Sequence, residues 1–130
     1  MKARTIYPGG AEGEALVSRD PIGFYGGIDA KTGVVIEKGT ALEGTCVKGK
    51  ILVFPCGKGS TVGSYVIYGL QKNGVAPAAI INHETETIVA TGVILAGIPC
   101  VDSVDIGKIH SGDQVRIVAK EKDAEVVLML

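Results

Sequence analysis

The stretch ILVFPCGKGSTVGS at 51–64 constrains the fold of this chain more than any other. Its continuous apolar run, 51–54, is typical of a strand buried on both faces, and Pro55 ends that strand. A glycine-rich turn follows and leads into a helix, for which Ser60 or Thr61 is the expected N-cap. Backbone N–H groups at such a helix start favour an anion, or a side chain that must become one.

The helix after this turn is expected to run from about Thr61 to Asn73, because Asn73 and Gly74 form a typical helix stop. Its apolar face is expected to comprise Val62, Tyr65, Val66, Gly69 and Leu70. The next apolar run, 78–82, predicts a second strand. The segment therefore predicts a strand–helix–strand unit with parallel strands.

The rest of the chain predicts a β-rich α/β domain with a mixed sheet and two main helices. The 130 residues are enough for one domain, 1–130, and the 19 glycines with only six aromatic residues favour tight turns over a helical bundle. A second helix is expected over 83–95. The other expected elements are strands at 12–18, 34–37 and 100–101 and a C-terminal hairpin of 113–119 and 124–130 around the turn 120–123.

Charge and cysteine usage exclude several classes of function. The net charge of −1 gives no reason to expect nucleic acid or an anionic membrane as a partner. No run approaches the roughly 18 apolar residues of a membrane helix. The proline and glycines that follow MKARTIY do not fit a signal peptide. Three cysteines, an odd number, argue against a disulfide framework and predict a cytoplasmic protein.

The turn itself matches none of the common glycine motifs. A P-loop requires Ser or Thr directly after Gly-Lys, but Gly59 follows Lys58. A dinucleotide fingerprint and a nucleophile elbow both require glycine where Val62 stands. A helix-capping serine in a tight turn is therefore the simplest interpretation of Ser60, and a reactive serine is the alternative that we favour.

The remaining polar candidates carry less information. Cys46, Cys56 and Cys100 lack the short Cys-x2-Cys spacing of iron–sulfur ligands and fit small buried thiols. His83 and His110 share no metal-ligand spacing.

A glycine-rich segment at 19–33 is expected to form a structured loop, anchored by Ile22, Phe24, Tyr25 and Ile28. We expect this loop to meet the turn 57–61 on one face of the domain, with Asp29 fixing the loop.

Several segments, taken in order, resemble one family. They are GFYGGID at 23–29, GKILVFPCGKGSTVGSYV at 49–66, APAAII at 76–81, IPCV at 98–101 and SGDQVRI at 111–117. The chain resembles the swivel domain of the aconitase X group over nearly its whole length. The resemblance implies a swivelling β/β/α domain, like the mobile domain of aconitase.

The same resemblance implies a hydro-lyase that is active only with a separate large subunit. That subunit would hold a [4Fe-4S] cluster, and Ser60 would take the proton from the carbon next to the departing hydroxyl. Lys58, Gly59 and Thr61 would bind a small phosphorylated hydroxy acid. The archaeal two-subunit members dehydrate (R)-5-phosphomevalonate to trans-anhydromevalonate 5-phosphate, a step toward isoprenoids.

The resemblance leaves two alternatives. Thr61 and Val62 stand where tricarboxylate enzymes have a substrate-binding arginine, which argues against a citrate-like substrate. A bacterial branch dehydrates cis-3-hydroxy-L-proline, usually with both domains in one chain, whereas this sequence contains only the smaller. The other alternative is a non-catalytic domain whose glycine-rich turn binds a phosphate ligand.

Overall fold

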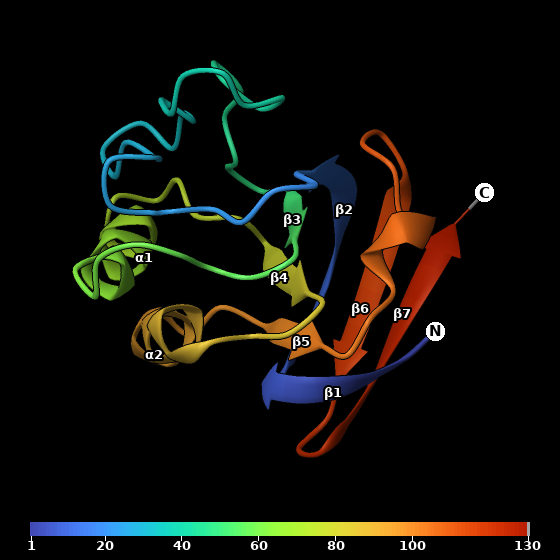
Figure 1. The fold of residues 1–130 in the computed structure, drawn as a ribbon. Helices are drawn as coiled ribbons and strands as arrows, with labels where there is room; N and C mark the ends of the chain where they lie inside the picture. Colours follow the sequence, from blue (N-terminus) through green and yellow to red (C-terminus); the bar gives the residue numbers. More distant parts are fainter. Residues whose placement is uncertain (130) are drawn as a thin grey trace.

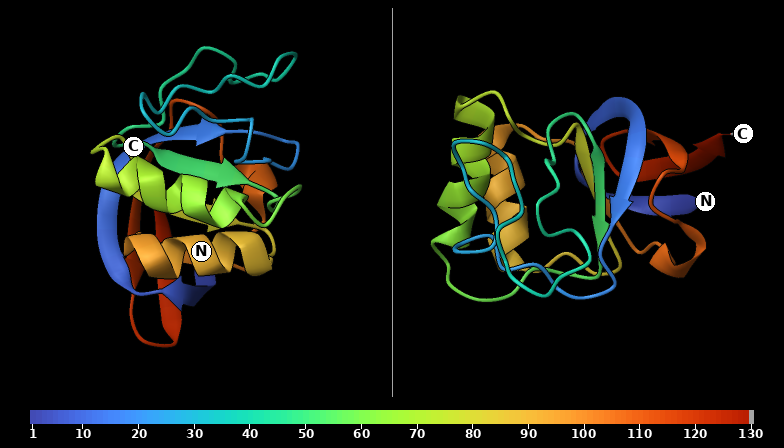
Figure 2. Two further views of the ribbon diagram at one scale, coloured as in Figure 1. Left: turned by 90° about the vertical axis from the view of Figure 1, so that its left-hand side faces the viewer. Right: turned by 90° about the horizontal axis from the view of Figure 1, so that it is seen from above.

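A mixed seven-stranded sheet closes into a barrel, and two helices pack side by side against one flank of it in the computed structural model, which describes residues 1–129 (Figure 1; Figure 2). The strands are β1 (Lys2–Tyr7), β2 (Gly9–Val17), β3 (Ile51–Phe54), β4 (Ala79–Asn82), β5 (Cys100–Asp102), β6 (Gln114–Ala119) and β7 (Asp123–Met129). The helices are α1 (Gly63–Lys72), α2 (Thr87–Ala96) and the short 3-10 helix η1 (Ile106–Lys108). The expected β-rich α/β domain with a mixed sheet and two main helices is confirmed.

Four neighbouring strands of the barrel, β2, β3, β4 and β5, run parallel. Helix α1 connects β3 to β4 and α2 connects β4 to β5, so the predicted strand–helix–strand unit is present and is repeated once. The other pairings, which involve β1, β6 and β7, are antiparallel and close the barrel. Because the carboxyl ends of parallel strands meet at one edge, the loops after β2 to β5 gather there.

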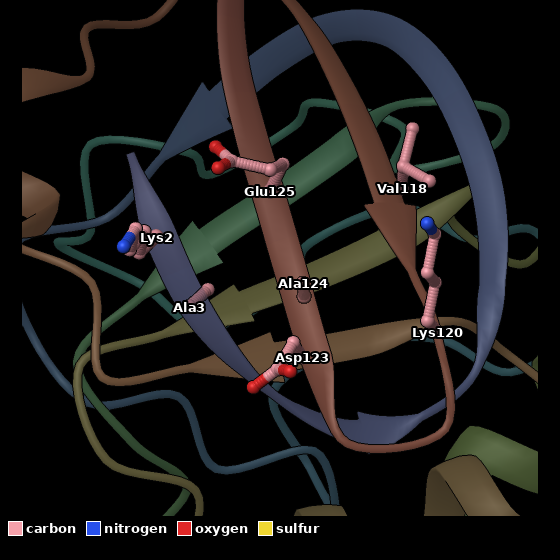
Figure 3. A pocket seen from close by; sticks show the side chains of 7 residues that line it. All are labelled: Lys2, Ala3, Val118, Lys120, Asp123, Ala124 and Glu125. Atoms are coloured by element: carbon pink, nitrogen blue, oxygen red, sulfur yellow. The ribbon is translucent and has the colours of Figure 1, made fainter.

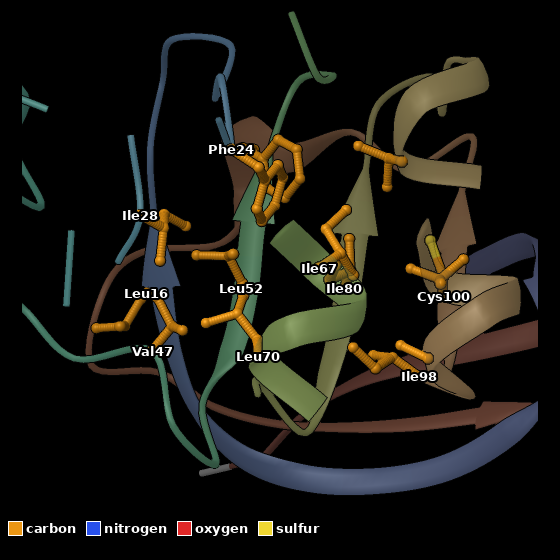
Figure 4. Close-up of a cluster of buried hydrophobic side chains, with 14 of the residues drawn as sticks. Leu16, Phe24, Ile28, Val47, Leu52, Ile67, Leu70, Ile80, Ile98 and Cys100 are labelled. Atoms are coloured by element: carbon orange, nitrogen blue, oxygen red, sulfur yellow. The ribbon is translucent and has the colours of Figure 1, made fainter. Parts of the chain in front are cut away.

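Both faces of the parallel strands are buried, which explains their continuous apolar runs. In β3, Ile51 and Val53 belong to the core inside the barrel, whereas Leu52 and Phe54 belong to the core beneath the helices (Figure 4). Strand β4 alternates in the same way. The sheet thus separates two apolar cores, and the helices cover only one of them.

Two expected strands differ from the structure. Strand β1 was not expected, yet it pairs with β5 and β7. Likewise β2 begins at Gly9 rather than at residue 12, because Gly9 and Gly10 pair with β6. The expected strand at 34–37 was wrong: Val34 and Val35 form only isolated bridges within a long loop.

The expected apolar face of α1 was also largely wrong. Of the expected positions only Leu70 is buried, whereas Val62 and Tyr65 are exposed. The helix buries Gly63, Ser64, Ile67 and Leu70 instead. The small residues Gly63 and Ser64 allow α1 to pack closely against α2. A search for apolar residues alone does not identify such positions.

Gly92→Ala is expected to lower the free energy of unfolding. A Cβ atom at this position of α2 would lie 2.6 Å from Cδ1 and 2.9 Å from Cβ of the buried Ile67. Overpacking such a site costs about 1–3 kcal/mol, which exceeds the roughly 1 kcal/mol by which alanine favours a helix over glycine. Urea denaturation at equilibrium measures the change.

Gly69→Ala is the matched control, since its added Cβ would make only a 3.4 Å contact with Ala30 Cβ. It should be neutral or stabilise by up to about 1 kcal/mol. Equal effects at both glycines would contradict the close helix packing.

Candidate active site

The predicted reactive turn lies at the carboxyl edge of the parallel strands. It follows β3 directly, and Gly59 has a backbone φ of +86°, which glycine adopts without strain. Lys58, Gly59, Ser60 and Thr61 are all exposed. The four predicted site residues therefore form one continuous, accessible segment in front of α1.

Ser60 caps a tight turn rather than the helix itself. Its Oγ accepts a hydrogen bond of 3.1 Å from the Val62 N–H, and its carbonyl oxygen accepts one of 2.9 Å from the Gly63 N–H. Helix α1 begins only at Gly63, with Val62 at the N-cap position and no side-chain cap. The expected capping by Ser60 or Thr61 was thus wrong, because a turn of i→i+3 bonds precedes the helix.

Three consecutive backbone donors of the turn have no partner in the part of the chain that the structure describes. Within residues 1–129, the amide groups of Gly59, Ser60 and Thr61 have no protein acceptor, whereas the Lys58 N–H donates to the Ile22 carbonyl oxygen. Consecutive free amide groups in a turn are suited to bind an anion. The turn thus offers preorganised donors beside the Ser60 hydroxyl.

The loop 19–33 and the turn 57–61 meet, as expected. The Ile22 N–H donates to the Cys56 carbonyl oxygen at 3.1 Å, and the Lys58 N–H returns a bond of the same length to Ile22. Phe24 anchors the loop, since its buried ring packs edge-on against Phe54 with centroids 5.7 Å apart. Tyr25 does not anchor it, because 63 % of its surface is exposed.

Asp29 fixes the loop through its own backbone and side chain. Its Oδ1 accepts from the Lys31 N–H at 2.9 Å, and its N–H donates to the Val34 carbonyl oxygen. The role expected for Asp29 is therefore confirmed. Further along, Glu37 Oε1 lies 3.7 Å from Lys58 Nζ, which directs this exposed ammonium group across the loop.

Glu86 supports the turn from the start of α2. Its two carboxylate oxygens accept from the Ile88 and Val89 N–H groups, at 2.8 and 3.0 Å. Gly57 packs directly against this carboxylate, and a Cβ atom there would collide with it. The missing side chain at Gly57 therefore sets how closely the turn approaches α2.

A buried polar network links the ends of β3, β4 and β5 to β1. Asn82 Nδ2 donates to the Phe54 carbonyl oxygen at 3.0 Å, and Thr85 Oγ1 donates to Asn82 Oδ1 at 2.9 Å. The Thr85 N–H donates to Asp102 Oδ2, and Arg4 binds both oxygens of Asp102. Sequence reasoning missed this network, although a polar residue ending each of two apolar strands was a usable signal.

The pKa of Asp102 is held below its ordinary value. Desolvation of this fully buried carboxyl would raise the pKa, but hydrogen bonds from Arg4, the Thr85 N–H and Ser103 outweigh it. A depressed pKa stabilises the fold above the unfolded value of about 4 and loses this contribution as the pH falls through the folded value.

Arg4→Ala is therefore expected to destabilise the protein most at neutral pH. Hydrogen bonds to a charged group contribute about 1.5–3 kcal/mol, and the variant leaves Asp102 buried without its cation. The deficit should shrink at acidic pH, as Asp102 takes up a proton. Urea midpoints at both pH values test this.

Arg116→Ala is the control for this pair, because Arg116 and Glu12 form an exposed ion pair with an N–O distance of 3.0 Å. Such pairs contribute about 0–1 kcal/mol. A pH-independent deficit in Arg4→Ala would contradict the proposed role of the Asp102 charge.

The cysteines and histidines do not gather into a site. No group of three or more His, Cys, Asp or Glu side chains in residues 1–129 is placed to hold a metal ion. Burial raises the pKa of Cys100 to about 12, so this thiol stays neutral. His83 Nδ1 lies 3.4 Å from the Val104 carbonyl oxygen, and His110 is exposed in the loop between β5 and β6.

A separate hollow lies where β1, β6 and β7 meet (Figure 3). Lys2, Lys120, Asp123 and Glu125 supply its polar groups. None of the predicted site residues lines it.

Neither helix α1 nor α2 is long and apolar enough to cross a membrane, and the same holds for every described helix.

Comparison with known proteins establishes the family of this chain. Residues 1–126 match the aconitase X swivel domain. The chain belongs to the aconitase X swivel-domain family. The resemblance on which the sequence analysis relied is therefore confirmed, and it extends over nearly the whole chain.

Two relatives at high identity share one name. The phosphomevalonate dehydratase small subunit of Thermococcus onnurineus is 56 % identical over 126 residues, which cover 97 % of each chain. The protein of the same name from Methanosarcina acetivorans is 55 % identical over 130 residues, covering 98 % of this chain and 90 % of the relative.

Two solved structures are similar to this aconitase X swivel domain. The crystal structure of Thermococcus kodakaraensis aconitase X in its holo-form superposes with a TM-score of 0.92 at 53 % identity, covering 98 % of both chains. The solution structure of a UPF0107 protein gives a TM-score of 0.86 at 51 % identity, covering 98 % of this chain and 99 % of the other.

Proposed function

We propose that this chain is the small subunit of a phosphomevalonate dehydratase, active only with a large subunit. The observation that carries the proposal is the exposed Ser60 turn at the carboxyl edge, in a chain 56 % identical to a small subunit of that name. The reaction removes one water molecule from (R)-5-phosphomevalonate and gives trans-anhydromevalonate 5-phosphate. It belongs to isoprenoid synthesis by the mevalonate route, and we place it in the cytoplasm.

Ser60 is the general base in this proposal. Its oxygen takes a proton from the carbon next to the hydroxyl-bearing carbon, the released electron pair forms the new double bond, and the hydroxyl group departs. A serine hydroxyl is a weak base in water, so its alkoxide requires fixed donors in a dry site. The free amide groups of Gly59 and Thr61 supply donors, and Lys58 supplies positive charge.

In this proposal Lys58, Gly59 and Thr61 bind the substrate, and the same geometry supports that role. An ammonium group and two backbone N–H groups form a combination that suits a phosphate or carboxylate. Lys58 Nζ leaves its exposed ion pair with Glu37 to bind the substrate, and a closing large subunit excludes water from the turn. The reaction therefore needs both subunits.

The cysteines of this chain do not fit a [4Fe-4S] cluster. Cys46 and Cys56 lie on separate loops, Cys100 is buried in β5, and residues 1–129 bring no three such ligands together. We therefore assign the cluster to the large subunit, where it supplies a Lewis acid for the departing hydroxyl.

Reconstitution tests this proposal. The chain is co-expressed with the aconitase X large subunit encoded in the same genome, and the purified complex is assayed on (R)-5-phosphomevalonate and on cis-3-hydroxy-L-proline. We expect dehydration of the first substrate only. Turnover of hydroxyproline alone would favour the other branch of the family, and no turnover of either by a cluster-loaded complex would favour a ligand-binding domain.

The isolated chain is expected to fold without iron. Anaerobic reconstitution of this chain alone, followed by iron and sulfide analysis, measures it. A stoichiometric cluster on the isolated chain would overturn the assignment of the cluster to the large subunit.

A further inference from the structure

The outer side of the helix pair lacks charge to an unusual extent. Residues 59–71 and 87–101 include no Asp, Glu, Lys or Arg, although 21 % of the chain is charged. These two stretches contain nearly all of α1 and the whole of α2. Solvated helix faces normally carry charged side chains, so this surface is unlike a free helix surface.

Large apolar side chains are exposed on the same surface. Tyr65 is 68 % exposed, Ile94 57 % and Leu95 49 %, and Val62 is exposed too. Charge enters only at the end of α1, where Lys72 Nζ lies 6.0 Å from the centroid of the Tyr68 ring. Single exposed apolar residues are common, but a cluster on two adjacent helices is typical of an interaction site. Tyrosine is also enriched at protein interfaces.

Two of these side chains, Tyr65 and Leu95, border a groove between the helices, here called the α1–α2 groove. It is lined by Thr61, Ser64, Tyr65, Thr87, Ile88, Thr91 and Leu95. The two helices lie side by side with their outer faces open (Figure 2, left). Both helices start at the carboxyl edge of the sheet, because each follows a parallel strand. Thr61 at one end of the groove is the residue after Ser60, so the groove opens directly onto the reactive turn.

We propose that the large subunit docks along the α1–α2 groove with an apolar, uncharged segment, an inference that rests on the proposed function. The same partner that excludes water from Ser60 must cover the start of the groove, since Thr61 belongs to both. A second copy of this chain in the groove would block the approach to Ser60. An apolar segment is required because a charged one would lose its hydration without gaining an opposite charge.

Leu95→Lys tests the proposal at the end of the groove farthest along α2 from Ser60. Lysine in the last turn of a helix suits the helix dipole, so the fold should tolerate the change. We expect the affinity for the large subunit, measured by titration calorimetry with the purified proteins, to fall at least ~10-fold because the ammonium group is desolvated without a partner.

Val127→Lys is the matched control. Val127 is similarly exposed but lies on β7, across the barrel from the helices (Figure 1). Its affinity for the large subunit should stay within about 2-fold of wild type, as for a change outside an interface. Equal affinity of Leu95→Lys and wild type would overturn docking along the groove. Failure of the wild-type chain to bind would instead overturn the proposed function.

Hydroxyl-radical footprinting of the unmodified complex gives a second measurement that needs no variant. Labelling of Tyr65 and Leu95 should fall several-fold when the large subunit binds, while labelling of Val127 should not change. Unchanged labelling of Tyr65 and Leu95 in a complex that turns over substrate would overturn the inference. The same protection in the isolated chain at high concentration, with a doubled mass in sedimentation, would also overturn it in favour of a homodimer.

Discussion

Ser60→Ala is expected to reduce turnover of the assembled, cluster-loaded complex by at least ~10²-fold, because the variant lacks the oxygen that takes the proton. Stability should change little. The side chain is exposed and accepts one bond, from the Val62 N–H, and losing such a cap costs about 0.5–2 kcal/mol. Turnover per folded complex separates the two effects, provided that melting and subunit affinity are measured on the same preparation.

Ser111→Ala is the control for this experiment. Ser111 Oγ also accepts one backbone bond, from the Val17 N–H at 2.8 Å, but Ser111 belongs to the loop before β6. Its loss should cost a similar amount of stability and leave turnover intact. Near-normal turnover in Ser60→Ala would return Ser60 to the role of a turn cap.

The parts of the fold that sequence predicted depend on local patterns. The strand–helix–strand unit around α1 and the hairpin of β6 and β7 each have their turn residues and apolar runs adjacent in sequence. Strand β1 was missed because its partners, β5 and β7, lie about 100 residues away, so no nearby residue signals the pairing. The strand expected at 34–37 was wrong for the opposite reason: its residues favour β-structure locally, but no neighbouring strand is available to it.

The candidate site, like the fold, has a part that the sequence predicted and a part that it did not. The turn that carries Ser60 was found from the sequence because strand, glycines and helix follow one another without interruption. Its contact with the loop 19–33, through Ile22, was expected, but the support from Glu86 was not, because Glu86 contacts the turn only through the fold. The bond between Arg4 and Asp102 joins residues 98 positions apart, a pairing that no spacing rule predicts.

These supports give the turn its fixed position, which a serine base requires. Misplacing a catalytic group by about 1 Å can cost ~10²-fold in rate even when every reacting atom is present. Ile22 holds the turn through two backbone bonds, and Glu86 with α2 sets its approach from the other side. Residues that touch no substrate thereby determine the position of Ser60.

Gly57→Ala should therefore reduce turnover by ~10²-fold although Ser60 is retained. The added Cβ would collide with the Glu86 carboxylate and lie 2.8 Å from Val89 Cγ2. Glu86 cannot withdraw without losing its two bonds to the first turn of α2, so the turn must move instead. Steady-state assays of the complex measure the effect, and the NMR spectrum of the isolated chain should show amide shifts confined to 55–63 and the start of α2.

Gly10→Ala controls for the general cost of adding a methyl group. Its Cβ would meet only the Ile117 carbonyl oxygen, at an ordinary 3.7 Å. Gly10 lies near the amino-terminal end of β2, whereas the turn lies at the carboxyl edge of the sheet. Turnover in this variant should match wild type. If Gly57→Ala also turned over normally while its amide shifts showed a displaced turn, the position of Ser60 would be set by the large subunit on closing and not by Gly57 and Glu86 within this chain.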